Sequence, residues 1–172
     1  MNLVRLLCES EAQTQRLGHA LGVCLRAGDV VLLEGEMGAG KSVLTRAAAR
    51  GMGVEGPVPS PTFTILNIHE GTQLRLYHFD LYRLEGADAL YEMGLEEYIP
   101  AQDGASMIEW PQMAQEAMPE DALRITMRYA QDGLAREAQL EPMGAFDEAR
   151  IVQLMQTYDA MEDGADGGEE ML

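Results

Sequence analysis

The sequence predicts an α/β domain of three layers around a central mixed β-sheet. The first supporting observation is a buried-strand pattern at residues 30–33, followed by a glycine-rich turn and a helix-forming segment at residues 42–50. The second is a pair of strand-like segments, residues 63–70 and 73–81, with a tight connection between them. Such a short connection predicts an antiparallel hairpin within an otherwise α/β pattern.

A third observation comes from the C-terminal half of the chain. Residues 123–129 alternate between apolar and polar side chains, as do residues 135–140, and turn-forming residues lie between the two segments. Alternation with a period of two is typical of a strand with one face in the core and the other in solvent. We therefore expect two antiparallel strands at an edge of the sheet.

The other elements follow from shorter patterns. Ser10 and Gln13 form the capping-box pair that opens a helix, and three prolines within residues 56–62 predict a stiff, irregular loop. In chain order, the remaining predicted elements are a strand at residues 3–7, a helix from residue 10 to about residue 26, a short helix at 87–93, a strand at 105–109 and a helix at about 146–161.

A chain of 172 residues is long enough for one ordinary domain but not for two. We assign that domain to residues 1–141 and residues 142–172 to an acidic extension, in which a helix precedes a tail that is expected to be disordered. The helix could pack on the domain or on a partner. Because the formal net charge is -17, the surface is expected to repel nucleic-acid phosphates.

The sequence contains no run of about 20 apolar residues, as a membrane-spanning helix would need, and its N-terminus does not resemble a signal peptide. We therefore expect a cytoplasmic protein without a membrane partner. Cys8 and Cys24 show no metal-binding or disulfide spacing, so we expect both to be reduced and buried.

The glycine-rich turn is the most specific motif of the chain. Residues 35–42 match the phosphate-binding pattern G-x-x-x-x-G-K-[ST] in full, and Lys41 is the only lysine. Between a strand and a helix, such a loop surrounds phosphate oxygens with backbone N–H groups. Lys41 would reach the β- and γ-phosphates, and the Ser42 hydroxyl would bind Mg²⁺. The sequence therefore predicts a nucleoside triphosphate site and a P-loop NTPase-like fold.

Hydrolysis of a bound nucleotide needs carboxylates that hold Mg²⁺ or orient the attacking water. Asp80 and Glu109 each end a predicted strand, where α/β sheets bind their ligands. This placement alone leaves open that either residue is an ordinary surface acid. His78 shares a strand face with Asp80 and is interpreted as a core histidine, and Arg83 is assigned to holding the following loop in preference to binding phosphate.

Three further motifs follow the glycine loop: Ser60-Pro61-Thr62-Phe63, then His78-Phe79-Asp80-Leu81-Tyr82-Arg83-Leu84, then Glu109-Trp110-Pro111. In this order they resemble the motifs of the TsaE family, small P-loop ATPases of bacterial tRNA threonylcarbamoyladenosine (t6A) biosynthesis. The resemblance covers about residues 2–140. Four separated motifs in the right order are far more specific than the glycine loop alone.

The resemblance implies that the cofactors are ATP and Mg²⁺ and that Thr62 lies in a switch-like loop near the γ-phosphate. It leaves Glu109 as either a Mg²⁺ partner or the residue that orients water, and Trp110 as either a nucleotide contact or a half-buried core residue. The residues implicated are Lys41, Asp80 and Glu109 in catalysis, Ser42, Asp80 and Glu109 at the metal, and Glu36, Met37, Gly38, Ala39, Gly40, Lys41, Ser42, Val43, Thr62 and Trp110 at the nucleotide.

By the same resemblance, the protein would act with TsaB and TsaD, of which TsaD transfers the threonylcarbamoyl group to adenosine 37 of tRNA. ATP turnover would reset or drive that assembly, and contact with tRNA is expected only through these partners. Two other classes of function stay open: a small-molecule or nucleotide kinase, and a non-catalytic nucleotide-sensing subunit. Because no in-cis arginine finger is obvious, the partners are expected to accelerate hydrolysis.

Overall fold

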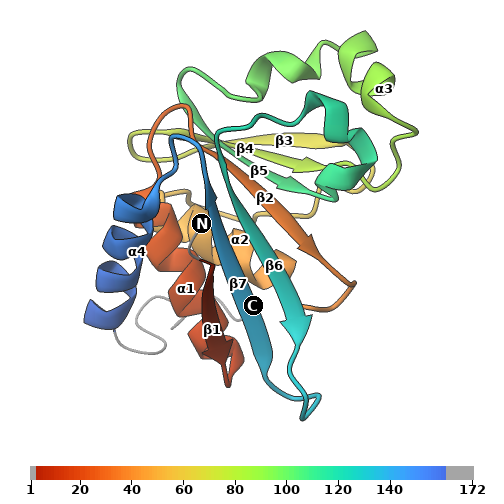
Figure 1. The fold of residues 1–172 in the computed structure, drawn as a ribbon. Coiled ribbons are helices and arrows are strands. Elements are labelled where there is room, and N and C mark those ends of the chain that lie inside the picture. Colours follow the sequence, from red (N-terminus) through yellow and green to blue (C-terminus); the bar gives the residue numbers. More distant parts are fainter. Residues whose placement is uncertain (1–2, 162–172) are drawn as a thin grey trace.

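A computed structural model describes residues 3–161 of the chain. These residues form one seven-stranded sheet with helices on both faces (Figure 1). In chain order the elements are β1 (Val4–Cys8), α1 (Glu11–Cys24), β2 (Val30–Gly35), α2 (Lys41–Gly51), β3 (Leu66–Glu70), β4 (Arg75–Asp80), α3 (Ala87–Glu92), the 3-10 helix η1 (Leu95–Tyr98), β5 (Gly104–Glu109), the 3-10 helix η2 (Pro111–Ala117), β6 (Ala122–Tyr129), β7 (Arg136–Met143) and α4 (Glu148–Ala160).

The strands are arranged in the order β1-β7-β6-β2-β5-β4-β3. Strands β6, β2, β5 and β4 run parallel to one another. Antiparallel pairs join β1 to β7, β7 to β6, and β3 to β4. The predicted mixed sheet and both predicted antiparallel pairs are therefore confirmed.

Two apolar clusters, one on each face of the sheet, create the three layers. The larger packs α1, α2 and α4 against one face, and the smaller packs α3, η1 and η2 against the other (Figure 1). Strand β2 contributes Val31 and Leu33 to the first cluster and Val30 and Leu32 to the second. Because helices cover both of its faces, this strand is a continuous apolar run without alternation.

The prediction that residues 123–129 and 135–140 form edge strands is wrong. Strand β6 lies between β7 and β2, strand β7 lies between β1 and β6, and the edges are β1 and β3. The smaller helical layer covers only the start of β6, so one face of this inner strand stays partly exposed. Arg124 uses that face to pair with Glu34 on β2 and Glu141 on β7, at 3.4 and 3.6 Å. The alternation of β6 thus reflects an uncovered face, not an edge.

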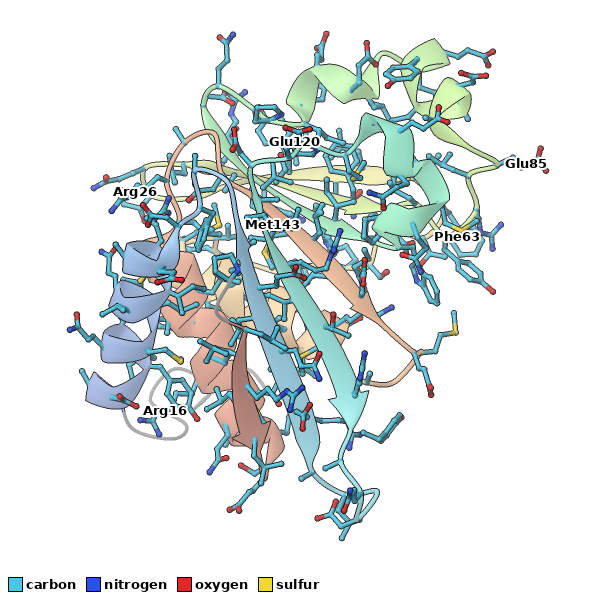
Figure 2. The ribbon with its side chains drawn as sticks, in the orientation of Figure 1. Arg16, Arg26, Phe63, Glu85, Glu120 and Met143 are labelled. Carbon is cyan, nitrogen blue, oxygen red and sulfur yellow. The ribbon has the colours of Figure 1, made fainter. Side chains whose placement is uncertain are left out.

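Strand β3 begins at Leu66, three residues later than predicted. A turn precedes it, and Ile65 has φ +68°, a left-handed conformation that is strained for a β-branched residue and interrupts an extended chain. Phe63 therefore stays outside the sheet and is 81% exposed. It lies on the outer surface, far from α4 (Figure 2).

The predicted C-terminal helix is α4, and it packs on the domain. Its contributions to the larger apolar cluster are Ile151, Leu154 and Tyr158. Arg150 ties the helix to the turn before β2 by donating to both carboxylate oxygens of Asp29, at 3.1 and 2.5 Å. Strand β7 continues to Met143, past the residue where the domain was expected to end. The acidic tail predicted to be disordered lies outside the described residues.

Cys8 and Cys24 are free and buried, as predicted. Within residues 3–161 the structure contains no helix that is both long enough and apolar enough to cross a membrane.

The packing of α4 can be tested by truncating one buried side chain. Leu154 is fully buried, so Leu154→Ala should lower the free energy of unfolding by about 2–5 kcal/mol through lost contacts and a residual cavity. Val152, on the same helix, is 54% exposed, so Val152→Ala should change stability by less than about 0.5 kcal/mol. Urea unfolding measures both. Equal effects would show that α4 does not pack on the domain in solution.

Candidate functional site

The glycine loop, residues 35–42, joins β2 to α2 with a backbone that has a positive φ at Gly35, Gly38 and Gly40. Gly35 has φ +143°, and a side chain there would collide with the carbonyl oxygen of Met127. Gly40 has φ +110° and is the N-cap of α2. Because this cap has no side chain and the first turn of α2 carries no acidic residue, the N–H groups of that turn are available to an anion.

The predicted nucleotide contacts of the loop differ in exposure. Glu36, Met37, Gly38 and Ser42 are exposed, Gly40 and Val43 are half-buried, and Ala39 and Lys41 are buried. Arg136 of β7 also reaches the loop, because its Nη2 donates to the carbonyl oxygen of Gly38 at 3.4 Å. Its guanidinium group stacks 4.1 Å from the ring centre of Tyr129. One side of the loop is therefore bounded by the β6–β7 hairpin.

Lys41 is buried although it carries a charge. Its Nζ donates to the carbonyl oxygen of Gly35 at 2.6 Å and lies 4.0 Å from the ring centre of Trp110. Desolvation lowers the pKa of Lys41, and the negative charges of Glu109 and Asp80 oppose that shift. The lysine and the two predicted carboxylates therefore occupy one electrostatically coupled site.

Asp80 and Glu109 lie side by side at the ends of β4 and β5. These parallel strands are in a register that pairs Asp80 with Glu109, so both side chains lie on the same face of the sheet. They are 7% and 4% exposed, respectively. Neither residue is an ordinary surface acid, because each is buried where the carboxyl ends of the strands meet the glycine loop.

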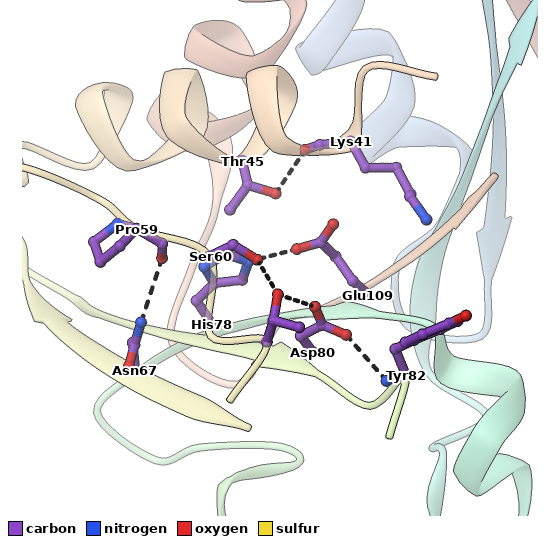
Figure 3. Close-up of polar contacts among 10 residues, drawn as sticks. Lys41, Thr45, Pro59, Ser60, Asn67, His78, Asp80, Tyr82 and Glu109 are labelled. Carbon is purple, nitrogen blue, oxygen red and sulfur yellow. Dashed lines mark hydrogen bonds and ion pairs between the residues drawn. The ribbon is translucent and has the colours of Figure 1, made fainter. Parts of the chain in front are cut away.

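The proline-rich loop is attached to this site through Thr62. The Thr62 hydroxyl donates to Asp80 Oδ2 at 3.2 Å and is hydrogen-bonded to the Ser60 hydroxyl at 3.0 Å (Figure 3). The other oxygen of Asp80 accepts from the backbone N–H of Tyr82 at 3.0 Å. Asp80 thus connects the loop before β3 to the turn after β4, and any group that draws Asp80 away would release Thr62.

Oxygen atoms of Ser42, Asp80 and Glu109 are hard donors of the kind that Mg²⁺ accepts. Among residues 3–161, no three or more histidine, cysteine, aspartate or glutamate side chains lie close enough to form a metal site by themselves. This donor set fits Mg²⁺, which normally keeps several waters and takes its other ligands from one or two carboxylates and nucleotide phosphates.

Comparison with known proteins identifies the family. The profile of a family described as "Threonylcarbamoyl adenosine biosynthesis protein TsaE" matches residues 8–138. The chain belongs to the TsaE family. The TsaE protein of Streptomyces coelicolor is 40% identical over 126 residues, covering 72% of this chain and 84% of that protein. The TsaE protein of Bacillus subtilis is 38% identical over 120 residues, covering 70% and 74% of the two chains.

The fold is shared as well. The crystal structure of YdiB from Bacillus subtilis superposes with a TM-score of 0.77 at 29% sequence identity, covering 90% of this chain and 95% of that one. The match to the TsaE profile ends at residue 138, so α4 lies beyond it.

His78 is the residue of this TsaE site that sequence reasoning undervalued. It is 2% exposed, as a core histidine should be, but its Nε2 lies 2.9 Å from Glu109 Oε2 (Figure 3). The spacing of two residues from Asp80 correctly placed both side chains on one face. The contact with Glu109 depends on the pairing of β4 with β5, which the sequence does not specify.

The structure places Trp110 and Arg83 in different environments. Trp110 is half-buried, has φ +59° at the turn into η2, and packs against Tyr82 with ring centres 4.9 Å apart. Its indole covers Lys41, so it borders the glycine loop directly. Arg83 is exposed and stacks on Phe63 at 4.2 Å, an interaction between the two loops that flank Asp80.

Trp110 should report nucleotide binding by its fluorescence. It is the only tryptophan, and phosphate groups in the loop would draw the Lys41 ammonium away from the indole face. Titration with Mg-ATP should therefore give a saturable change in emission intensity or wavelength. In Lys41→Ala the change should disappear. An unchanged spectrum at nucleotide concentrations that saturate binding by calorimetry would contradict this arrangement.

Proposed function

We propose that this TsaE-family protein is a Mg²⁺-dependent ATPase of tRNA t6A37 modification that acts with TsaB and TsaD. ATP hydrolysis resets or drives that assembly and takes no chemical part in threonylcarbamoyl transfer. The observation that carries the proposal is the convergence of buried Lys41, Asp80 and Glu109 at an uncapped helix N-terminus.

Each group has a task in hydrolysis. Backbone N–H groups of the glycine loop and Lys41 bind the β- and γ-phosphates, which holds the γ-phosphorus in place. Glu109 fixes either Mg²⁺ or the attacking water, and both tasks need a carboxylate of defined position. Bound Mg²⁺ would neutralise charge on the phosphates. Water attack then breaks the bond between the γ-phosphorus and the β,γ-bridging oxygen, giving ADP and phosphate.

The loop contacts of Asp80 suggest how nucleotide binding is sensed. Asp80 holds Thr62 by a hydrogen bond. If Asp80 helped to hold Mg²⁺, its carboxylate would be less available to Thr62, so the loop carrying Thr62 and Phe63 would be released to rearrange. Since Phe63 is already exposed, this loop can present the nucleotide state to TsaB and TsaD.

Loss of the lysine should abolish tight nucleotide binding. Saturation at about one hundred times Kd stabilises the native state by about 2.7 kcal/mol, which for a chain of this size is a shift in Tm of about 5–10 °C. Wild type should show this shift with Mg-ATP, and Lys41→Ala should show almost none. Arg46→Ala is the matched control, because it removes an exposed positive charge from the same helix. Equal shifts in wild type and Lys41→Ala would remove the basis for a phosphate site.

Loss of either carboxylate should impair hydrolysis more than binding. In the presence of TsaB and TsaD, Asp80→Ala and Glu109→Ala should each lower kcat by at least about tenfold and raise the Kd for Mg-ATP by a smaller factor. Phosphate release and calorimetry measure the two quantities. Glu92→Ala, an exposed acid on α3, serves as the control.

These measurements also separate the alternatives. Hydrolysis that requires a phosphoryl acceptor would indicate a kinase. Binding of Mg-ATP without turnover, even with TsaB and TsaD present, would indicate a nucleotide-sensing subunit.

A further inference from the structure

We propose that His78 is a positioning residue that fixes the carboxylate of Glu109 for ATP hydrolysis. The inference rests on the proposed ATPase function and adds to it a residue that has no contact with the nucleotide. Its basis is the buried contact between His78 Nε2 and Glu109 Oε2 at 2.9 Å.

The chemistry of the two groups defines the direction of the hydrogen bond. A carboxylate only accepts, so Nε2 of His78 carries the hydrogen and donates it to Glu109. Nδ1 of the same ring is buried and has no hydrogen-bond partner among residues 3–161. Among the described residues, the imidazole ring of His78 therefore forms its hydrogen bond with one atom, Glu109 Oε2.

The surrounding sheet holds the histidine rigidly. His78 lies in β4, which is paired with β3 on one side and β5 on the other, and its side chain is 2% exposed. Glu109 has three side-chain torsions and is the last residue of β5, where the ladder ends. A fixed donor on the neighbouring strand therefore restricts a flexible acceptor. Similar support by outer residues orients the ligands of metal sites.

His78 acts through Glu109 and does not touch the reacting groups. The histidine lies beside Glu109, on the face of the sheet that carries Asp80 and Glu109 (Figure 3). Its Nε2 engages one oxygen of Glu109, which leaves the second oxygen to face Mg²⁺ or water. The hydrogen bond from His78 thus fixes the orientation of the Glu109 carboxylate and leaves one of its oxygens to act. This holds whether Glu109 binds Mg²⁺ or orients the attacking water.

The test compares three substitutions that differ in where they place a donor. In His78→Gln the amide nitrogen occupies roughly the position of Nε2, in His78→Asn it occupies that of Nδ1, and His78→Leu has no donor. With TsaB and TsaD present, His78→Asn and His78→Leu should lower kcat by about 10–100-fold, whereas the Kd for Mg-ATP should change by less than about threefold. His78→Gln should recover most of the lost kcat.

Two controls separate positioning from general destabilisation. Leu76→Val removes buried volume from the same face of β4 and leaves both His78 and Glu109 in place, so it should lower Tm but not kcat per folded molecule. In a Glu109→Gln background, His78→Leu should cause little further loss of kcat, because the residue through which it acts is already altered.

Crystal structures of the wild type, His78→Gln and His78→Leu give a readout that needs no hydrolysis. Glu109 should occupy one conformation in the first two and a different one, or several, in the third. The proposal is overturned if Glu109 has the same conformation in His78→Leu as in wild type. It is also overturned if His78→Gln, His78→Asn and His78→Leu all have the same kcat as one another. If wild type fails to hydrolyse ATP while Glu109 moves only in His78→Leu, the positioning role stands and the proposed ATPase function fails.

Discussion

The burial of one ammonium group is the constraint around which this structure is arranged. Taking an unpaired lysine out of water costs several kcal/mol, so Lys41 can stay buried only if other groups compensate its charge. A carbonyl oxygen of the glycine loop, the face of an indole and two carboxylates do so, and they come from the loop, the turn before η2, β4 and β5. The same groups are those that a phosphate ligand would rearrange.

Strand register makes this compensation possible. Asp80 and Glu109 are paired residues of adjacent parallel strands, so a slip of one residue in either strand would turn one carboxylate to the opposite face, away from Lys41. Alternation along β4 also places Leu76, His78 and Asp80 on one face, with Leu76 in the larger core cluster. Packing of that cluster therefore helps to keep Asp80 paired with Glu109, because a shift of β4 that misplaced Asp80 would also expose Leu76.

The sequence predicted the parts of this site that depend on local structure. Glycine at positions needing a positive φ, a lysine after them, and carboxylates at strand ends are all properties of short segments, and the structure places them together. Features that depend on strand order could not be predicted from the sequence. The position of β6 inside the sheet was missed because alternation reports which faces are covered, not which neighbours a strand has. The contact of His78 with Glu109 was missed for a related reason, since it joins residues of two strands whose pairing no local pattern specifies.

Charge explains why such a site would bind its nucleotide as a metal complex. Lys41 supplies one positive charge and Asp80 with Glu109 supply two negative ones, so the three side chains together do not favour a tetra-anionic ligand. The segment of residues 84–123, which includes Glu109, adds no positive charge, because it contains ten acidic residues and no lysine or arginine. Attraction for phosphate must come from the N–H groups and dipole of α2, which act over the first turn only. In the proposed mechanism a divalent cation would offset the negative charges of Asp80 and Glu109. Arg136, which already borders the loop, or a partner protein would then supply further positive charge near the γ-phosphate in the transition state.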